Sequence, residues 1–147
     1  MASRRTALKA GLAVAATPLI GWTLPTKLDV LLREAFGARP IQAGKVSISL
    51  PALAENGNSV PITVAVDSPM NKVDRVHFLQ LFAPQNPVPR LARFEFSAAS
   101  GVAEVETRIR IADEQDVVAV AGLADGSLWR GAAHIVVTEA ACIDALI

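Results

Sequence analysis

The stretch Val60-Pro61-Ile62-Thr63-Val64-Ala65-Val66 decides the fold class, because apolar residues occupy every second position along it. A period of two places alternate side chains on opposite faces of a β-strand, so the stretch predicts a strand with one buried face. The same alternation recurs at residues 46–50 and 105–111. An Asp125-Gly126 pair, which favours tight hairpin turns, marks a further connection between strands. The sequence therefore predicts a domain built mainly of β-strands.

Seven strand-like segments follow one another at regular spacing after residue 40. The remaining four, recognised by alternation or by continuous apolar runs, are residues 75–82, 92–96, 117–123 and 128–138. Residues 83–89 contain three prolines, which cannot donate to a strand ladder, so this segment is expected to be a loop. About seven short strands separated by turns are typical of an antiparallel β-sandwich of immunoglobulin type, which is the fold class we expect.

One helix is expected before the strands, at residues 27–36. Apolar residues recur there at helical spacing, namely Leu28, Leu31, Leu32 and Ala35. Thr26 can cap the N-terminus, with Asp29 three residues later in the position that completes a capping box. Gly37 is a natural stop, because glycine commonly ends helices.

Composition excludes several classes of protein. The chain has 147 residues, 52% of them hydrophobic, which is enough for one domain with a substantial core. Its single cysteine excludes an intrachain disulfide and a cysteine-based zinc site. Three of the 14 Lys and Arg residues, and none of the 14 Asp and Glu, lie within residues 1–25, so residues 26–147 carry a net charge of −3. This mildly acidic body argues against general binding of nucleic-acid phosphates.

The N-terminus has the pattern of an export signal. Ser3-Arg4-Arg5-Thr6-Ala7-Leu8-Lys9 resembles the twin-arginine pattern S-R-R-x-F-L-K, with Ala7 at the aromatic position, and a short apolar stretch follows at residues 10–20. That stretch is too short for a comfortable membrane span, so we expect none in the mature protein. The predicted location is the bacterial periplasm. Two alternatives stay open: an uncleaved anchor, and cleavage either after Ala13-Val14-Ala15 or near residues 21–26.

These features divide the chain into three parts. Residues 1–25 are predicted to be the twin-arginine-type export signal, residues 26–139 the sandwich with its leading helix, and residues 140–147 a tail that carries Cys142. A terminal tail is usually exposed unless it is docked. An exposed thiol in an exported protein is a liability unless it is used, paired between chains or hidden. From the residues alone, a functional thiol and a buried inert one both remain open.

No other residue combination predicts catalysis or metal binding. His77 and His134 each lie within a strand pattern and are interpreted as surface or hydrogen-bonded strand histidines, because no cluster with ligand spacing accompanies them. Three acidic residues before an apolar strand are interpreted as a solvated loop: Asp113, Glu114 and Asp116. We therefore expect no catalytic residues, no metal site and no cofactor.

Two further features have structural explanations. Arg108 and Arg110 share the polar face of one strand with acidic residues, which predicts a charged, exposed face that discourages pairing with another strand. Trp129 is interpreted as an anchor in the core or at an interface.

Several segments, taken together and in order, are similar to the SoxY family. Residues 50–61 read Leu-Pro-Ala-Leu-Ala-Glu-Asn-Gly-Asn-Ser-Val-Pro, and residues 64–70 read Val-Ala-Val-Asp-Ser-Pro-Met. Further matching segments are Asn86-Pro87-x-Pro89, Thr107-Arg108-Ile109-Arg110-Ile111-Ala112 and Asp125-Gly126-Ser127-x-Trp129. The resemblance runs from about Leu28 to Cys142, and the export signal agrees with it, because SoxY subunits reach the periplasm by the twin-arginine route.

The resemblance implies a fold, a role and partners. It implies an immunoglobulin-like sandwich that forms a heterodimer with a second sandwich subunit, SoxZ. It also implies a non-catalytic carrier of the periplasmic thiosulfate-oxidising Sox system. A haem enzyme loads sulfur onto a cysteine near the C-terminus, and a manganese-dependent hydrolase and, in some systems, a sulfane dehydrogenase then act on the adduct. By position, Cys142 corresponds to that carrier cysteine.

The tail departs from the family pattern. The usual ending is Gly-Gly-Cys-Gly-Gly, whereas this chain has Ala140-Ala141-Cys142-Ile143-Asp144. Alanine restricts the backbone more than glycine does, so the sequence predicts a stiffer arm. A second hypothesis follows from this departure: a SoxY-like structural or adaptor sandwich that no longer carries sulfur.

Overall fold

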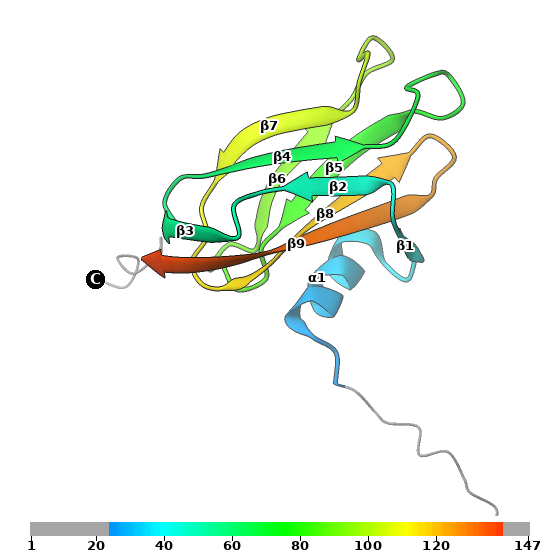
Figure 1. The fold of residues 1–147 in the computed structure, drawn as a ribbon. Coiled ribbons are helices and arrows are strands. Elements are labelled where there is room, and N and C mark those ends of the chain that lie inside the picture. The colour runs from blue at the N-terminus through cyan, green and yellow to red at the C-terminus, as the bar shows by residue number, and fades with distance from the viewer. Residues whose placement is uncertain (1–23, 140–147) are drawn as a thin grey trace, which may run out of the picture.

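The computed structural model describes residues 24–139 of the chain, and Figure 1 shows their arrangement. The predicted export signal and the predicted Cys142-bearing tail therefore lie outside the described residues, apart from Leu24 and Pro25. One helix, α1 (Lys27–Phe36), precedes nine strands. The strands are β1 (Ile41–Ala43), β2 (Val46–Ser49), β3 (Leu53–Asn56), β4 (Val60–Val66), β5 (Val76–Phe82), β6 (Arg90–Glu95), β7 (Glu104–Ile109), β8 (Gln115–Leu123) and β9 (Leu128–Glu139).

The strands form two sheets that face each other. The larger sheet has the order β1-β9-β8-β5-β6, with β3 added beside β9, and the smaller has the order β2-β4-β7. All seven predicted strands are present, so the predicted sandwich is confirmed. Its long pairings are antiparallel, for example β8 with β9 and β4 with β7.

The sequence did not predict β1 and β3. Each has only three or four residues, and neither shows an alternation of buried and exposed positions. Both pair in parallel with β9: Ile41 lies opposite Leu128, and Leu53 lies opposite Val136. These short strands are defined by the long strand beside them and not by a pattern of their own.

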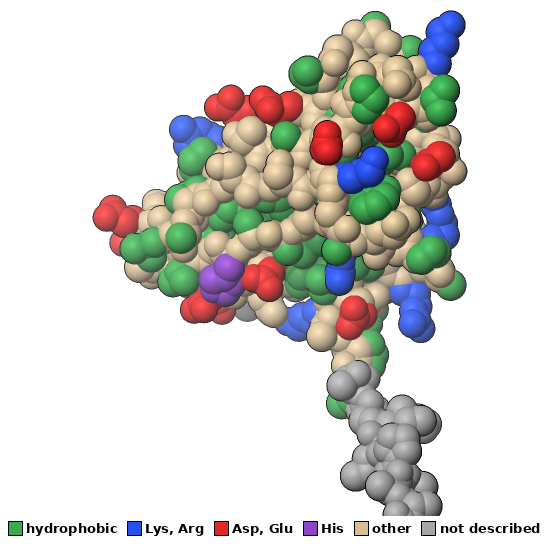
Figure 2. All heavy atoms as spheres, turned by 45° about the vertical axis from the view of Figure 1, so that its right-hand side comes forward, with side chains coloured by type: hydrophobic (Ala, Val, Ile, Leu, Met, Phe, Trp, Pro, Cys, Tyr) green, Lys and Arg blue, Asp and Glu red, His purple; other side chains and the backbone are tan. Residues whose placement is uncertain are grey.

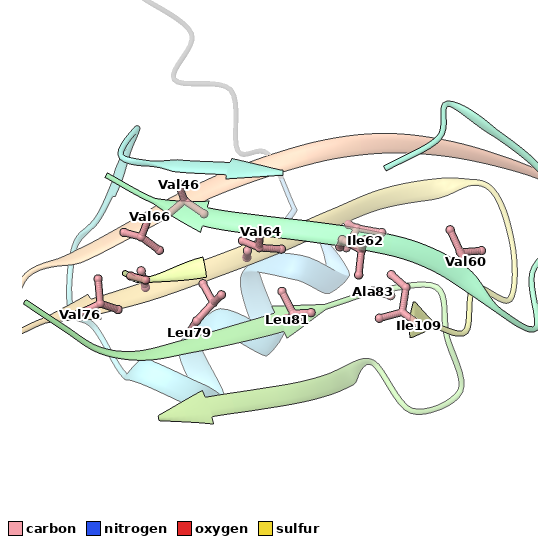
Figure 3. Close-up of a cluster of buried hydrophobic side chains, with 14 of the residues drawn as sticks. Val46, Val60, Ile62, Val64, Val66, Val76, Leu79, Leu81, Ala83 and Ile109 are labelled. Atoms are coloured by element: carbon pink, nitrogen blue, oxygen red, sulfur yellow. The ribbon is translucent and has the colours of Figure 1, made fainter. Parts of the chain in front are cut away.

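The main core fills the space between the two sheets. Figure 3 shows side chains of β4 and β5 pointing toward one another across this space, with Ile62 and Val64 facing Leu79 and Leu81. All four are at most 1% exposed. The alternation that defined β4 in the sequence thus has its physical cause in one buried face.

Helix α1 covers the outer face of the larger sheet. Its buried Leu32 and Phe36 pack in a second apolar cluster with Phe82, Val118 and Leu128. The predicted capping box is present, since the Thr26 hydroxyl accepts a hydrogen bond from the Asp29 amide and the Asp29 carboxylate accepts one from the Thr26 amide. The helix ends at Gly37, which has a φ of 68°.

A close approach between the sheets depends on Gly131 of β9. A Cβ atom at this position would lie 2.2 Å from the carbonyl oxygen of Val46 in β2, which is a clash with backbone. Glycine is therefore required where β2 crosses β9 (Figure 1). This crossing determines where β2, and β3 after it, lie along β9.

Candidate functional site

The C-terminal end of β9 is the described part of the candidate site. Cys142 lies outside the described residues, three positions after Glu139. Glu139 is therefore the described residue that stands nearest to Cys142 in the sequence, and its surroundings are what the structure shows of this end of the chain.

Short strand β3 fastens this end of β9 to the domain. Leu53 and Ala54 pair in parallel with Val136 and Val137, and Asn56 lies opposite Glu139. The Thr138 hydroxyl adds a hydrogen bond of 2.9 Å to the carbonyl oxygen of Glu55. The chain is thus held up to the last described residue, which gives the tail a fixed starting point.

Gly57 extends this attachment toward the smaller sheet. Its amide donates to the Glu139 carbonyl at 2.9 Å, and its own carbonyl accepts from the Ile111 amide, also at 2.9 Å. Ile111 follows β7 and is fully buried. This connection could not be predicted, because backbone hydrogen bonds between segments far apart in the chain leave no local sequence pattern.

A groove lies close to Ile111, between the edge strands β6 and β7. It has a volume of about 440 Å³ and apolar lining from Leu91, Ile109 and Val88, with Arg108 and Arg110 among its other lining residues. Arg108 and Arg110 are both exposed, as predicted, and the Arg108 guanidinium donates to the carbonyl oxygen of Ser59 at 3.3 Å.

Two polar side chains fasten the loop beside this groove. The Asn86 side-chain amide donates to the Arg110 carbonyl at 2.7 Å, and its oxygen accepts from the Ala112 amide at 2.9 Å. Buried Gln115 donates to the same Asn86 oxygen at 3.0 Å and accepts from the Gln85 amide at 2.9 Å. The proline-rich loop is therefore attached to the strand connection that follows β7.

His134 of β9 pairs with two carboxylates. Its Nδ1 lies 2.8 Å from Asp116 and its Nε2 lies 3.2 Å from Glu114. Hydrogen bonds to Asp116 and then to Glu114 raise the pKa of this histidine above its usual 6.5. His134 is thus a surface strand histidine with partners, as predicted. The prediction of a purely solvated acidic loop is wrong for Asp116, which lies in β8 opposite His134.

The other two predicted features agree with their structural interpretation. Half-buried Trp129 packs against the main core, and its indole N–H donates to the Ser127 hydroxyl at 3.0 Å. The ammonium of Lys45 lies 5.3 Å from the centre of the indole ring. His77 is exposed on β5.

Within residues 24–139, no group of three or more His, Asp or Glu side chains is arranged to hold a metal ion. No helix in this part of the chain is long and apolar enough to cross a membrane. On the face drawn in Figure 2, basic and acidic side chains are interspersed and form no extended patch of one sign. This face offers no surface suited to a nucleic-acid backbone.

Comparison with known proteins identifies the family. The model of the family described as "Sulfur oxidation protein SoxY" matches residues 32–142. The chain belongs to the SoxY family. The match extends through Cys142 and covers both sheets of the sandwich. A solved structure of the sulfur carrier protein SoxY from Chlorobium limicola f thiosulfatophilum is 33% identical, covers 76% of this chain and 96% of its own, and superposes with a TM-score of 0.63.

More distant structures share the fold of this SoxY protein. A superoxide reductase (neelaredoxin) from Ignicoccus hospitalis is 15% identical, covers 66% of this chain and 94% of its own, and has a TM-score of 0.58. A putative superoxide reductase from Thermotoga maritima is 18% identical, covers 68% and 89%, and has a TM-score of 0.56. At these identities the likeness concerns the sandwich alone. No curated protein matches the sequence.

Proposed function

We propose that this SoxY protein is a periplasmic covalent sulfur carrier that holds its cargo on Cys142. The observation that carries the proposal is the family match, which runs through the single cysteine of the chain. A relative that is 33% identical is itself a sulfur carrier protein. In this proposal, residues 1–25 are the export signal, residues 26–139 form the sandwich body and residues 140–147 are the carrier tail.

The chemistry requires one thiol that forms a sulfur–sulfur bond. When the Cys142 thiol joins the terminal sulfur of thiosulfate, an S–S bond forms, one proton leaves the thiol and two electrons are released. A haem-containing partner enzyme takes up the electrons, and a manganese-dependent hydrolase and, in some systems, a sulfane dehydrogenase then process the adduct. The carrier itself supplies no catalytic group in this scheme.

The body of the domain gives partner enzymes a fixed surface from which the tail starts. Glu139 is bound through its carbonyl to Gly57, and Thr138 is bound to Glu55. A SoxZ-like subunit completes the carrier as a heterodimer. Such an arrangement lets several enzymes grip the same body while they act on one thiol.

Intact mass spectrometry tests the proposal. The purified heterodimer is incubated with thiosulfate and the haem enzyme from the same organism, and Cys142→Ser serves as the matched control. We expect a mass increase that a reductant reverses and that the control lacks. The haem enzyme is first shown to load another SoxY protein. If the mass of the wild-type protein then stays unchanged, the proposal of a sulfur carrier is contradicted.

The tail sequence favours one second candidate, an adaptor sandwich that does not carry sulfur. Ala141 and Ile143 stand beside the cysteine where the family pattern has glycine. Alkylation of the native heterodimer separates the candidates. A carrier thiol reacts within minutes at the rate of an unfolded control, whereas an adaptor with a docked tail resists the reagent until it is denatured.

A further inference from the structure

A polar pocket lies at the end of the larger sheet opposite to the C-terminal end of β9. Its volume is about 270 Å³, and Arg75, His77 and Arg93 contribute to its lining at the start of β5 and the end of β6. The carbonyl of Arg75 accepts from the amide of Ala124, directly after β8. Strand β9 then runs from Leu128 to Glu139, and the 11 steps between its 12 residues span about 36 Å at roughly 3.3 Å per step. The pocket is therefore remote from the C-terminal end of β9.

The charges around this pocket favour an anion. Its lining includes two guanidinium groups and an imidazole, against the single carboxylate of Glu95. Glu95 lies 3.4 Å from Nε of Arg93, but both side chains are well exposed, at 76% and 44%. Exposed ion pairs of this kind are weak. Glu95 therefore offsets the positive charge of only one of the two arginines, and only weakly.

Arg93 is held in position by neutral partners. Its Nη1 donates to Gln80 at 3.3 Å, and its guanidinium lies 3.9 Å from the centre of the Phe78 ring. The Phe78 ring stacks on Phe36 of α1 with a centroid distance of 5.9 Å. It also lies against Gly122, where a Cβ atom would overlap the ring. A guanidinium fixed in this way loses little conformational freedom when it binds an anion.

Arg75 has a buried donor that needs a partner. Its Nε is buried and makes no hydrogen bond within residues 24–139. A buried unsatisfied donor is costly, and native proteins seldom leave one without an ion, a water or an acceptor. An oxyanion in the pocket would neutralise the excess positive charge that Arg75 and Arg93 bring to its lining.

We propose that Arg75 and Arg93 form a binding site for a small tetrahedral oxyanion with two negative charges, for which sulfate is the probe. Two guanidinium groups balance the two negative charges of such an anion. Each planar guanidinium can also donate two hydrogen bonds to a pair of oxygen atoms. The site is independent of Cys142 and of the proposed covalent chemistry. Its anion can be a free inorganic ion or a tetrahedral dianionic group presented by another molecule.

Nuclear magnetic resonance of the full-length protein tests the site. Sodium sulfate is titrated at constant ionic strength, with sodium chloride as the balance, and signals of Arg75, His77 and Arg93 are followed. We expect saturable shifts confined to these residues, and at least a tenfold weaker affinity in both Arg75→Gln and Arg93→Gln. Glu95→Gln removes the competing carboxylate and should bind sulfate several-fold more tightly.

Arg108→Gln is the matched control, because Arg108 lies on β7 of the other sheet, and its sulfate affinity should equal that of the wild type. Shifts that grow without saturation, or a wild-type affinity in Arg93→Gln, would overturn the site. If Arg75→Gln does not fold, as judged by circular dichroism, Arg93→Gln and Glu95→Gln decide. A parallel titration with acetate tests the shape and charge of the anion: acetate binding as tight as sulfate would overturn the tetrahedral, doubly charged assignment.

Discussion

The two ends of β9 are held in different ways. At its start, Leu128 is buried beneath α1 and Trp129 packs against the main core. At its end, Thr138 and Glu139 are exposed and are held by β3 and by hydrogen bonds to Glu55 and Gly57. Figure 1 shows both ends, with α1 beneath the first and β3 beside the second. One strand thus joins a region stabilised by apolar burial to a region held mainly by hydrogen bonds.

This difference suits a carrier. Burial supplies most of the stability of a domain, whereas a single hydrogen bond adds about 1 kcal/mol. The start of β9 therefore contributes to folding, and the end can serve a tail without supporting the core. Substitutions at the two ends should have effects of very different size.

The largest effect is expected where α1 covers the sheet. Phe36→Ala removes a ring that is 8% exposed and packs on Phe78 and Phe82. We expect the free energy of unfolding to fall by about 3–4 kcal/mol, as is usual for buried aromatic residues. Urea denaturation measures this loss. Val30→Ala, on an exposed position of the same helix, is the matched control and should change stability by less than about 0.5 kcal/mol.

The next effect is expected at the crossing of β2 and β9. Gly131→Ala places a Cβ atom against the Val46 carbonyl, so the two sheets must separate locally, at a cost of about 1–3 kcal/mol. Gly101→Ala is the control, because nothing lies within 4 Å of its Cβ position. Equal melting temperatures for the two variants would show that the close approach is not required.

A smaller effect is expected at the tail end. Thr138→Val removes the hydrogen bond to Glu55 and keeps the shape of the side chain, so the loss should be about 0.5–1 kcal/mol. Hydrogen exchange should accelerate at the amide of Gly57, which is bonded to Glu139, and not in β8. Acceleration spread through the whole sheet would mean that this end supports the core after all.

The smallest effect concerns the pH dependence of β9. His134 has a pKa raised by Asp116 and Glu114, so its stabilising contribution is fully present below about 6.5 and is lost as the pH rises through the raised value. The melting temperature of the wild type should therefore fall slightly across that interval, relative to His134→Gln. A wild-type slope in His134→Gln would assign the dependence to other groups.

The sequence predicted the parts of the fold that have a periodic pattern. The alternation in β4 and the capping box at Thr26 were both read correctly, because each reflects a local rule. Strands β1 and β3 escaped prediction, since they exist only through pairing with β9. The same limit applied to the candidate site: Cys142 was singled out from its position and the resemblance, whereas the link from Glu139 through Gly57 to Ile111 depends on tertiary structure.

Peptide mass spectrometry of the protein recovered from the periplasm tests the central claim most directly. The account predicts that the peptide containing Cys142 carries added sulfur, that a reductant removes it, and that no other peptide is modified. It also predicts that this peptide belongs to a chain that has lost an N-terminal segment ending by about residue 25. A Cys142 peptide that is consistently unmodified in cells oxidising thiosulfate would contradict the proposal that this protein is a sulfur carrier.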